Sequence, residues 1–183
     1  MNGWHSAHGW TLIELLVSLA LLALLTAVAL PGYQSLIQTQ SANRLRDDLF
    51  AHLTLARTQA RTLGLPVAVC TTTDLFVANP NNLQCASAGG DWTPGWFVFV
   101  DLNEDKQHQD GEPLISVYED APLNVSVRFN LNRAVLFDRQ GRASGSNGSF
   151  FVCRLDIEFL SAVVISPTGR IRFDAAKPEN CVG

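Results

Sequence analysis

The longest apolar stretch of the chain runs from Leu12 to Leu30, nineteen residues in which Glu14 carries the only charge. An α-helix of about this length crosses the hydrocarbon core of a bilayer. A carboxylate is unfavourable by roughly 3 kcal/mol at the bilayer centre, and by less near the headgroups, where a boundary residue can reach water. The pattern therefore predicts a membrane-length helix in which Glu14 either lies at the boundary or has a partner.

A second helical pattern follows Pro31 and Gly32. Apolar residues recur there at steps of three and four, which mark one face of an α-helix, at Ala42, Leu45, Leu49, Leu53, Ala56, Ala60 and Leu63. The pattern stops at Gly64-Leu65-Pro66, because glycine favours the end of a helix and proline cannot continue one. We expect one long helix, bent or loosened near Pro31 because proline lacks the backbone N–H, that packs this apolar stripe on the rest of the chain.

The remaining residues alternate short β-rich runs with turn residues, as antiparallel strands do. The predicted strands are 67–72, 95–100, 114–118, 125–130, 134–137, 150–153, 162–166 and 170–174. Residues 167–169 are a predicted hairpin turn, and 144–149 a flexible Gly/Ser-rich connection. The fold class is therefore α+β, a long N-terminal helix packed on an antiparallel sheet.

Charged residues are distributed unevenly along the chain. Residues 1–100 carry a net charge of −1, residues 101–120 carry −6, and residues 121–183 carry +3. A polyanionic partner would therefore meet the C-terminal third.

The four cysteines have no metal-type spacing; they are Cys70, Cys85, Cys153 and Cys181. On the oxidising side of a membrane they are expected to form two disulfides. Three connectivities are open, and pairing neighbours, Cys70 with Cys85 and Cys153 with Cys181, closes the shortest loops.

Residues 9–14, GWTLIE, resemble the prepilin processing signal of type IV pilins and of type II secretion pseudopilins. The resemblance implies that a prepilin peptidase cuts after Gly9 and methylates the new amino terminus at Trp10. It also implies that Glu14 pairs with the terminal amine of a neighbouring pilin subunit. Two features depart from the family: the leader has no Lys or Arg, and Trp10 stands where Phe is usual.

The same resemblance implies an organisation into a leader (1–9), a transmembrane and assembly helix (10–37) and a periplasmic head (38–183). The protein would cross the inner membrane once and enter a pilus filament after assembly. A secretory signal peptide is the alternative, but its apolar core is usually shorter and a small-residue cleavage site should follow it.

Further motifs lie in the second half of the chain: GWFVFVD at 95–101, DGE at 110–112, FDRQGR at 137–142 and SPTGRIRF at 166–173. Together they are similar to the GspH/FimT family of minor pilins and minor pseudopilins, most of all to its FimT-type members. The resemblance implies a binding and assembly protein without a cofactor rather than an enzyme. His52 and His108, far apart in sequence and without a nucleophile motif or zinc spacing, give catalysis little support.

Gly169, Arg170 and Arg172 form a G-R-x-R motif. On a strand the two arginines face the same way, and paired guanidinium groups suit a phosphate backbone. The motif resembles the DNA-binding motif of FimT-type minor pilins, which capture DNA for natural transformation, and Lys177 would add to it. Contact with double-stranded DNA would be non-specific. The alternative is a pair of solvated arginines in a structural or priming minor pilin, or in a type II secretion minor pseudopilin.

A weak calcium candidate lies in the acidic segment. Asp101, Asn103, Asp105 and Glu112 occupy positions 1, 3, 5 and 12 of an EF-hand-like spacing. Lys106 stands where that loop requires glycine, so a solvated acidic hairpin loop without a metal is the favoured interpretation.

Overall fold

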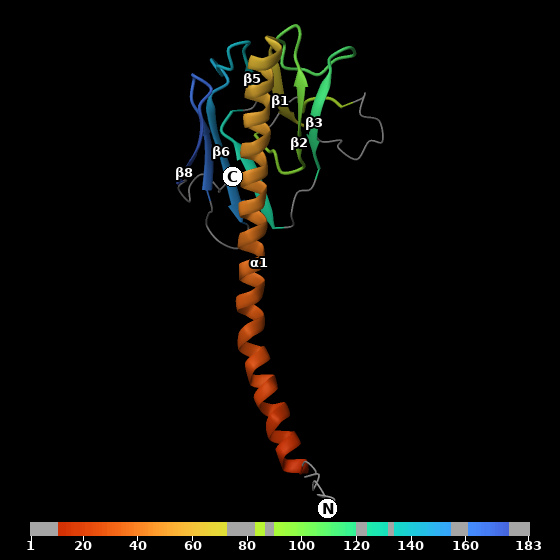
Figure 1. The fold of residues 1–183 in the computed structure, drawn as a ribbon, viewed down its shortest axis with the longest axis vertical. Coiled ribbons are helices and arrows are strands. Elements are labelled where there is room, and N and C mark those ends of the chain that lie inside the picture. Colours follow the sequence, from red (N-terminus) through yellow and green to blue (C-terminus); the bar gives the residue numbers. More distant parts are fainter. Residues whose placement is uncertain are drawn as a thin grey trace, which may run out of the picture. The chain divides into compact units, whose positions relative to one another are not determined.

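The computed structural model describes residues 11–72, 83–86, 90–119, 124–131, 134–154 and 161–175. These residues form one helix and eight strands (Figure 1). The elements are α1 (Leu12–Leu63), β1 (Val67–Thr71), β2 (Trp96–Val100), β3 (Leu114–Tyr118), β4 (Val125–Phe129), β5 (Val135–Phe137), β6 (Gly148–Arg154), β7 (Ser161–Ile165) and β8 (Ile171–Asp174). The chain divides into two compact units, residues 1–39 and 40–183.

In the first unit α1 begins after Thr11, whose hydroxyl accepts a hydrogen bond of 3.3 Å from the backbone N–H of Glu14. Threonine at the N-cap with glutamate three residues later is the capping-box pattern. The large apolar side chains from Leu12 to Leu25 are between 51% and 77% exposed. Among the residues described, no helix combines the length and the apolarity needed to span a membrane.

In the second unit α1 buries the apolar stripe that its sequence predicts. Six of the seven positions are at most 1% exposed: Ala42, Leu45, Leu49, Leu53, Ala56 and Ala60. Leu63, the last residue of the helix, is 49% exposed. Gly64 then adopts a φ of 65°, which ends the helix as predicted.

The strands form two four-stranded antiparallel sheets, with the orders β3-β2-β1-β5 and β4-β6-β7-β8. The α+β prediction is confirmed, although it placed the strands in one sheet. Side chains of both sheets and of the α1 stripe form a single core cluster. Trp92 and Trp96, 1% and 0% exposed, belong to this cluster.

The two central strands of the first sheet, β1 and β2, are buried on both faces, since every residue of these strands is buried. Leu83 and Cys85 pack on the face opposite the main core. A disulfide between Cys70 and Cys85, with Cα atoms 5.5 Å apart, joins this segment to β1. Cys153 is also disulfide-bonded, and Cys181 lies outside the described residues.

The Gly/Ser-rich segment 144–149 is shorter and more ordered than predicted. Ser146 is fully buried, and its N–H donates to the Ala143 carbonyl at 3.0 Å. The strand β6 already begins at Gly148. This backbone hydrogen bond and the burial of Ser146 explain why a segment of flexible composition forms a defined turn here.

Candidate nucleic-acid interface

Gly169 and Arg170 lie on the turn between β7 and β8, whereas Arg172 lies on β8 itself. The prediction that the last strand begins at Arg170 is therefore wrong by one residue. The Arg170 carbonyl accepts a hydrogen bond from the Ser166 N–H at 2.9 Å, but the Arg170 N–H donates to the Ser166 hydroxyl at 3.1 Å. Because that N–H is used within the turn, the strand ladder starts only at Ile171.

The two arginine side chains are both exposed but have different surroundings. A guanidinium nitrogen of Arg172 lies 3.2 Å from the Asp174 carboxylate. For the Arg170 guanidinium, the described residues provide no hydrogen bond or ion pair. Arg170 is therefore the more available of the two for an anionic ligand, and Lys177 lies outside the described residues.

The turn that carries Gly169 packs directly on a second turn, residues 138–142. Gly169 has a φ of 75°, and a Cβ atom on it would overlap the carbonyl oxygen of Gly141. The two turns are also joined by the Ala143 N–H, which donates to the Pro167 carbonyl at 3.1 Å. Only glycine fits at position 169, because both the backbone angle and the close approach exclude a side chain.

Asp138 shapes the second turn. Its carboxylate accepts N–H groups from Gln140 at 2.9 Å and from Arg142 at 2.8 Å, and pairs with the Arg142 guanidinium at 2.9 Å. Partial burial raises the pKa of the Asp138 carboxyl, but the hydrogen bonds from Arg142 and Gln140 outweigh this effect and hold the pKa below its usual value. The turn therefore contains an ionised carboxylate at neutral pH.

Arg57 of α1 contacts both turns through its guanidinium group. Its Nε donates to the Gly141 carbonyl at 3.1 Å, and a terminal nitrogen lies 3.5 Å from the Thr168 carbonyl. In the sequence, Arg57 is not one of the apolar positions that form the stripe of this helix. The contacts could not be predicted from local pattern, because these partners are 84 and 111 residues away.

In the acidic loop after β2, carboxylates accept hydrogen bonds from backbone N–H groups of the same loop. Asp101 is fully buried and accepts N–H groups from Asp105 at 3.2 Å and from Lys106 at 2.9 Å. Burial raises the pKa of the Asp101 carboxyl, and the hydrogen bond from Lys106 opposes this rise. Within the described part of the chain, no three His, Cys, Asp or Glu side chains are placed to hold a metal ion. The calcium candidate Asp101, Asn103, Asp105 and Glu112 therefore gains no support.

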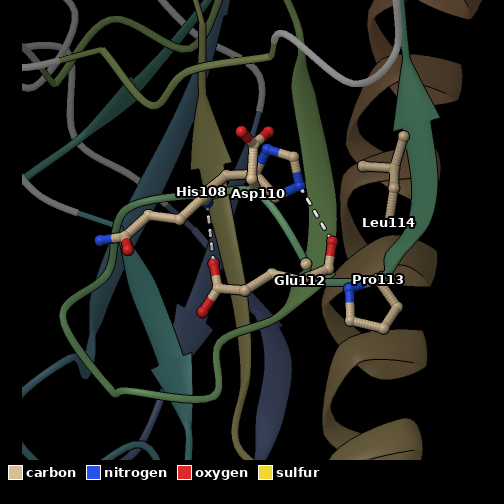
Figure 2. A pocket seen from close by; sticks show the side chains of 7 residues that line it. His108, Asp110, Glu112, Pro113 and Leu114 are labelled. Carbon is tan, nitrogen blue, oxygen red and sulfur yellow. Dashed lines mark hydrogen bonds between the residues drawn. The ribbon is translucent and has the colours of Figure 1, made fainter.

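A pocket of about 490 Å³ lies on the same loop and is lined by residues 108–114 (Figure 2). The two ring nitrogens of His108 lie 2.8 Å from the Leu83 carbonyl and 3.2 Å from the Glu112 carbonyl. The Glu112 carboxylate accepts the N–H of Gln109 at 2.9 Å. The His108 ring thus holds backbone in place, and none of the arginines described above lines the pocket.

Comparison with known proteins decides the family. Residues 46–169 match the family model described as type II transport protein GspH. The chain belongs to the GspH family. Residues 4–30 match the prokaryotic N-terminal methylation motif. The protein is thus a membrane-anchored subunit of minor pilin or pseudopilin type, and such subunits are structural rather than enzymatic. The GspH match ends at Gly169, so Arg170 and Arg172 lie just beyond it.

Solved structures agree with this fold. Two crystal structures of the type IV minor pilin FimU from Pseudomonas aeruginosa PAO1 are similar to the GspH-family chain at 14% identity. One gives a TM-score of 0.53 over 80% of this chain and 94% of FimU, and the other gives 0.50 over 74% and 90%. Among the curated proteins none matches. The likeness at this identity is one of fold.

Proposed function

We propose that this subunit is a minor type IV pilin that contacts double-stranded DNA through Gly169, Arg170 and Arg172 during uptake for natural transformation. The observation that carries the proposal is the position of Arg170. It is exposed on a turn whose backbone is fixed by Gly141 and by Arg57. The backbone at Arg170 is therefore already ordered before binding, so only the side chain has to be ordered when its guanidinium meets a phosphate.

Guanidinium groups bind phosphate oxygens through charged hydrogen bonds, often with two at once. Residues 121–183 carry a net charge of +3, so the long-range field also favours a polyanion there. Two arginines neutralise few phosphates, so binding should be weak, and it should fall further as the salt concentration rises. Contacts to the backbone carry no sequence preference.

We also propose the organisation that the N-terminal resemblance implies. Residues 1–9 form a leader that a prepilin peptidase removes after Gly9, residues 10–37 form a single-pass inner-membrane and assembly helix, and residues 38–183 form a periplasmic head. Trp10 becomes the methylated amino terminus, and Glu14 pairs with the amine of a neighbouring subunit. The match of residues 4–30 to the methylation motif supports this proposal, as does the exposed apolar surface from Leu12 to Leu25.

The DNA proposal is tested with the full-length chain in an uncharged detergent, by fluorescence anisotropy on duplex DNA at several salt concentrations. Each phosphate contact changes affinity about tenfold at roughly 0.1 M salt. We expect Arg170→Ala to weaken binding by about that factor. Arg172→Ala should weaken it less, because Asp174 already neutralises part of its charge.

Arg44→Ala is the matched control. Arg44 is also an exposed arginine, and it lies near the start of the part of α1 that belongs to the second unit. The substitution removes the same charge and should leave affinity nearly unchanged. Wild-type affinity in the Arg170→Ala, Arg172→Ala double variant would refute the proposal.

A second function is favoured by the family itself, since the GspH match is to a type II transport protein. In that case the chain is a minor pseudopilin, or a minor pilin that primes assembly, and does not bind DNA. Deletion of the gene separates these functions. Loss of transformation with intact pili supports DNA uptake, loss of pili supports priming, and loss of protein secretion supports the pseudopilin.

A further inference from the structure

We infer that the DNA-contacting surface extends beyond the G-R-x-R motif to Arg61 at the end of α1 and to Arg139 and Arg142 on the turn 138–142. This inference rests on the proposed DNA contact and adds residues that are remote from the motif in sequence. The observation behind it is the packing of the helix end and the two turns around Gly141 and Gly169.

The side chain of Arg61 packs against Gly141. A Cβ atom on Gly141 would be 2.8 Å from both Cγ and Cδ of Arg61, so the stem of that side chain covers the glycine. Gly141 is buried, while Arg61 is exposed. The apolar stem therefore lies on the turn and the guanidinium reaches water, as long basic side chains commonly do. Gly141 also contacts Gly169, which precedes Arg170.

The turn 138–142 contributes two more cations at this place. Arg139 is exposed, and Arg142 is exposed although it pairs with Asp138 at 2.9 Å. In the described part of the chain, the guanidinium groups of Arg61 and Arg139 have no hydrogen bond or ion pair. Both are therefore available to a ligand.

The charge balance of the three segments strongly favours an anion. Residues 57–63, 138–142 and 166–170 contain five arginines and one carboxylate, Asp138, which leaves a net charge of +4. Arg57, half-buried, donates to backbone carbonyls of both turns, so four arginines remain at the surface. Like charges repel when they are gathered, and a polyanion such as duplex DNA relieves this repulsion.

The extended surface predicts a steeper salt dependence than the motif alone. The logarithm of affinity falls with the logarithm of salt concentration by about 0.9 for each neutralised phosphate. Two contacts, from Arg170 and Arg172, predict a slope near −1.8, whereas five contacts, with Arg61, Arg139 and Arg142 added, predict a slope of roughly −4.5. The slope of the wild-type protein therefore reports the number of arginines engaged.

The test again uses the full-length chain in uncharged detergent, with a duplex DNA of random sequence as the probe. Arg61→Ala and Arg139→Ala are each expected to weaken binding about tenfold near 0.1 M salt and to reduce the slope by about 0.9. Arg44→Ala is the control, because Arg44 lies on the same helix roughly 25 Å from Arg61 and is also exposed. Unchanged unfolding midpoints would show that the variants keep their fold.

The outcomes distinguish this inference from the proposal on which it rests. If Arg61→Ala and Arg139→Ala bind like Arg44→Ala while Arg170→Ala binds weakly, the extension is overturned and DNA contact by the motif remains. If the first two weaken binding and Arg170→Ala does not, the extended surface is supported and the motif is not its centre. Failure of the wild-type chain to bind DNA overturns both.

Discussion

Gly169→Ala is expected to destabilise the head far more than Gly145→Ala, although both glycines have a φ of 75°. The backbone angle alone costs about 1–3 kcal/mol for a residue with a side chain. At Gly145 a Cβ atom meets nothing within 4 Å, so this strain is the whole effect. At Gly169 the Cβ atom would overlap the Gly141 carbonyl oxygen, which is backbone and cannot rotate away. We expect a further loss of roughly 2 kcal/mol or more from this forced displacement.

The measurement is urea unfolding of the two variants and the wild type, followed by the fluorescence of the buried Trp92 and Trp96. The difference between the two alanine variants isolates the contact between turns, because the backbone strain is common to both. Equal free energies of unfolding would mean that the turns do not touch. DNA affinity should fall in Gly169→Ala as well, because Arg170 is the next residue on the displaced turn.

Glu14→Gln is expected to block incorporation of the subunit into filaments. If the carboxylate pairs with a neighbour's amino terminus in an apolar surrounding, its loss leaves a buried charge unpaired. Breaking such a pair costs about 3–5 kcal/mol, which corresponds to a reduction of at least about a hundredfold. The measurement is the amount of subunit in purified filaments relative to the amount in the membrane.

The substitution by glutamine separates this function from helix capping. Thr11 and Glu14 form the first turn of α1, and glutamine also fits the capping-box pattern at that position. Glu14→Ala removes both capacities, so it should fail as well. Comparison of Glu14→Gln with the wild type isolates the charge, and comparison of the two variants isolates the capping capacity. Normal assembly of Glu14→Gln would show that the charge has no part in assembly and that the capping role is sufficient.

The helix could be predicted nearly completely from the sequence, because its signals are local. The apolar period identified the six buried positions from Ala42 to Ala60, and Gly64 marked the end. Strands were located within one or two residues for the same reason. Their division into two sheets could not be predicted, because pairing such as that between β1 and β5 joins segments far apart in the chain.

Only part of the candidate interface could be predicted from the sequence. The arginines of the motif could be read directly from SPTGRIRF, but the position of Arg170 off the strand depends on a hydrogen bond to Ser166. Arg57 and Arg61 reach the interface through tertiary contacts with Gly141, which no local pattern reports. The only available signal was the turn FDRQGR, in which Asp138 and a glycine lie between arginines.

The mature amino terminus gives the most direct test of the claim that this chain is a proteolytically processed subunit of a filament. Mass spectrometry of the protein from cells with an active prepilin peptidase should show a chain that begins at Trp10 with a methylated amine. Residues Met1 to Gly9 still attached in the assembled or membrane-bound protein would contradict the claim.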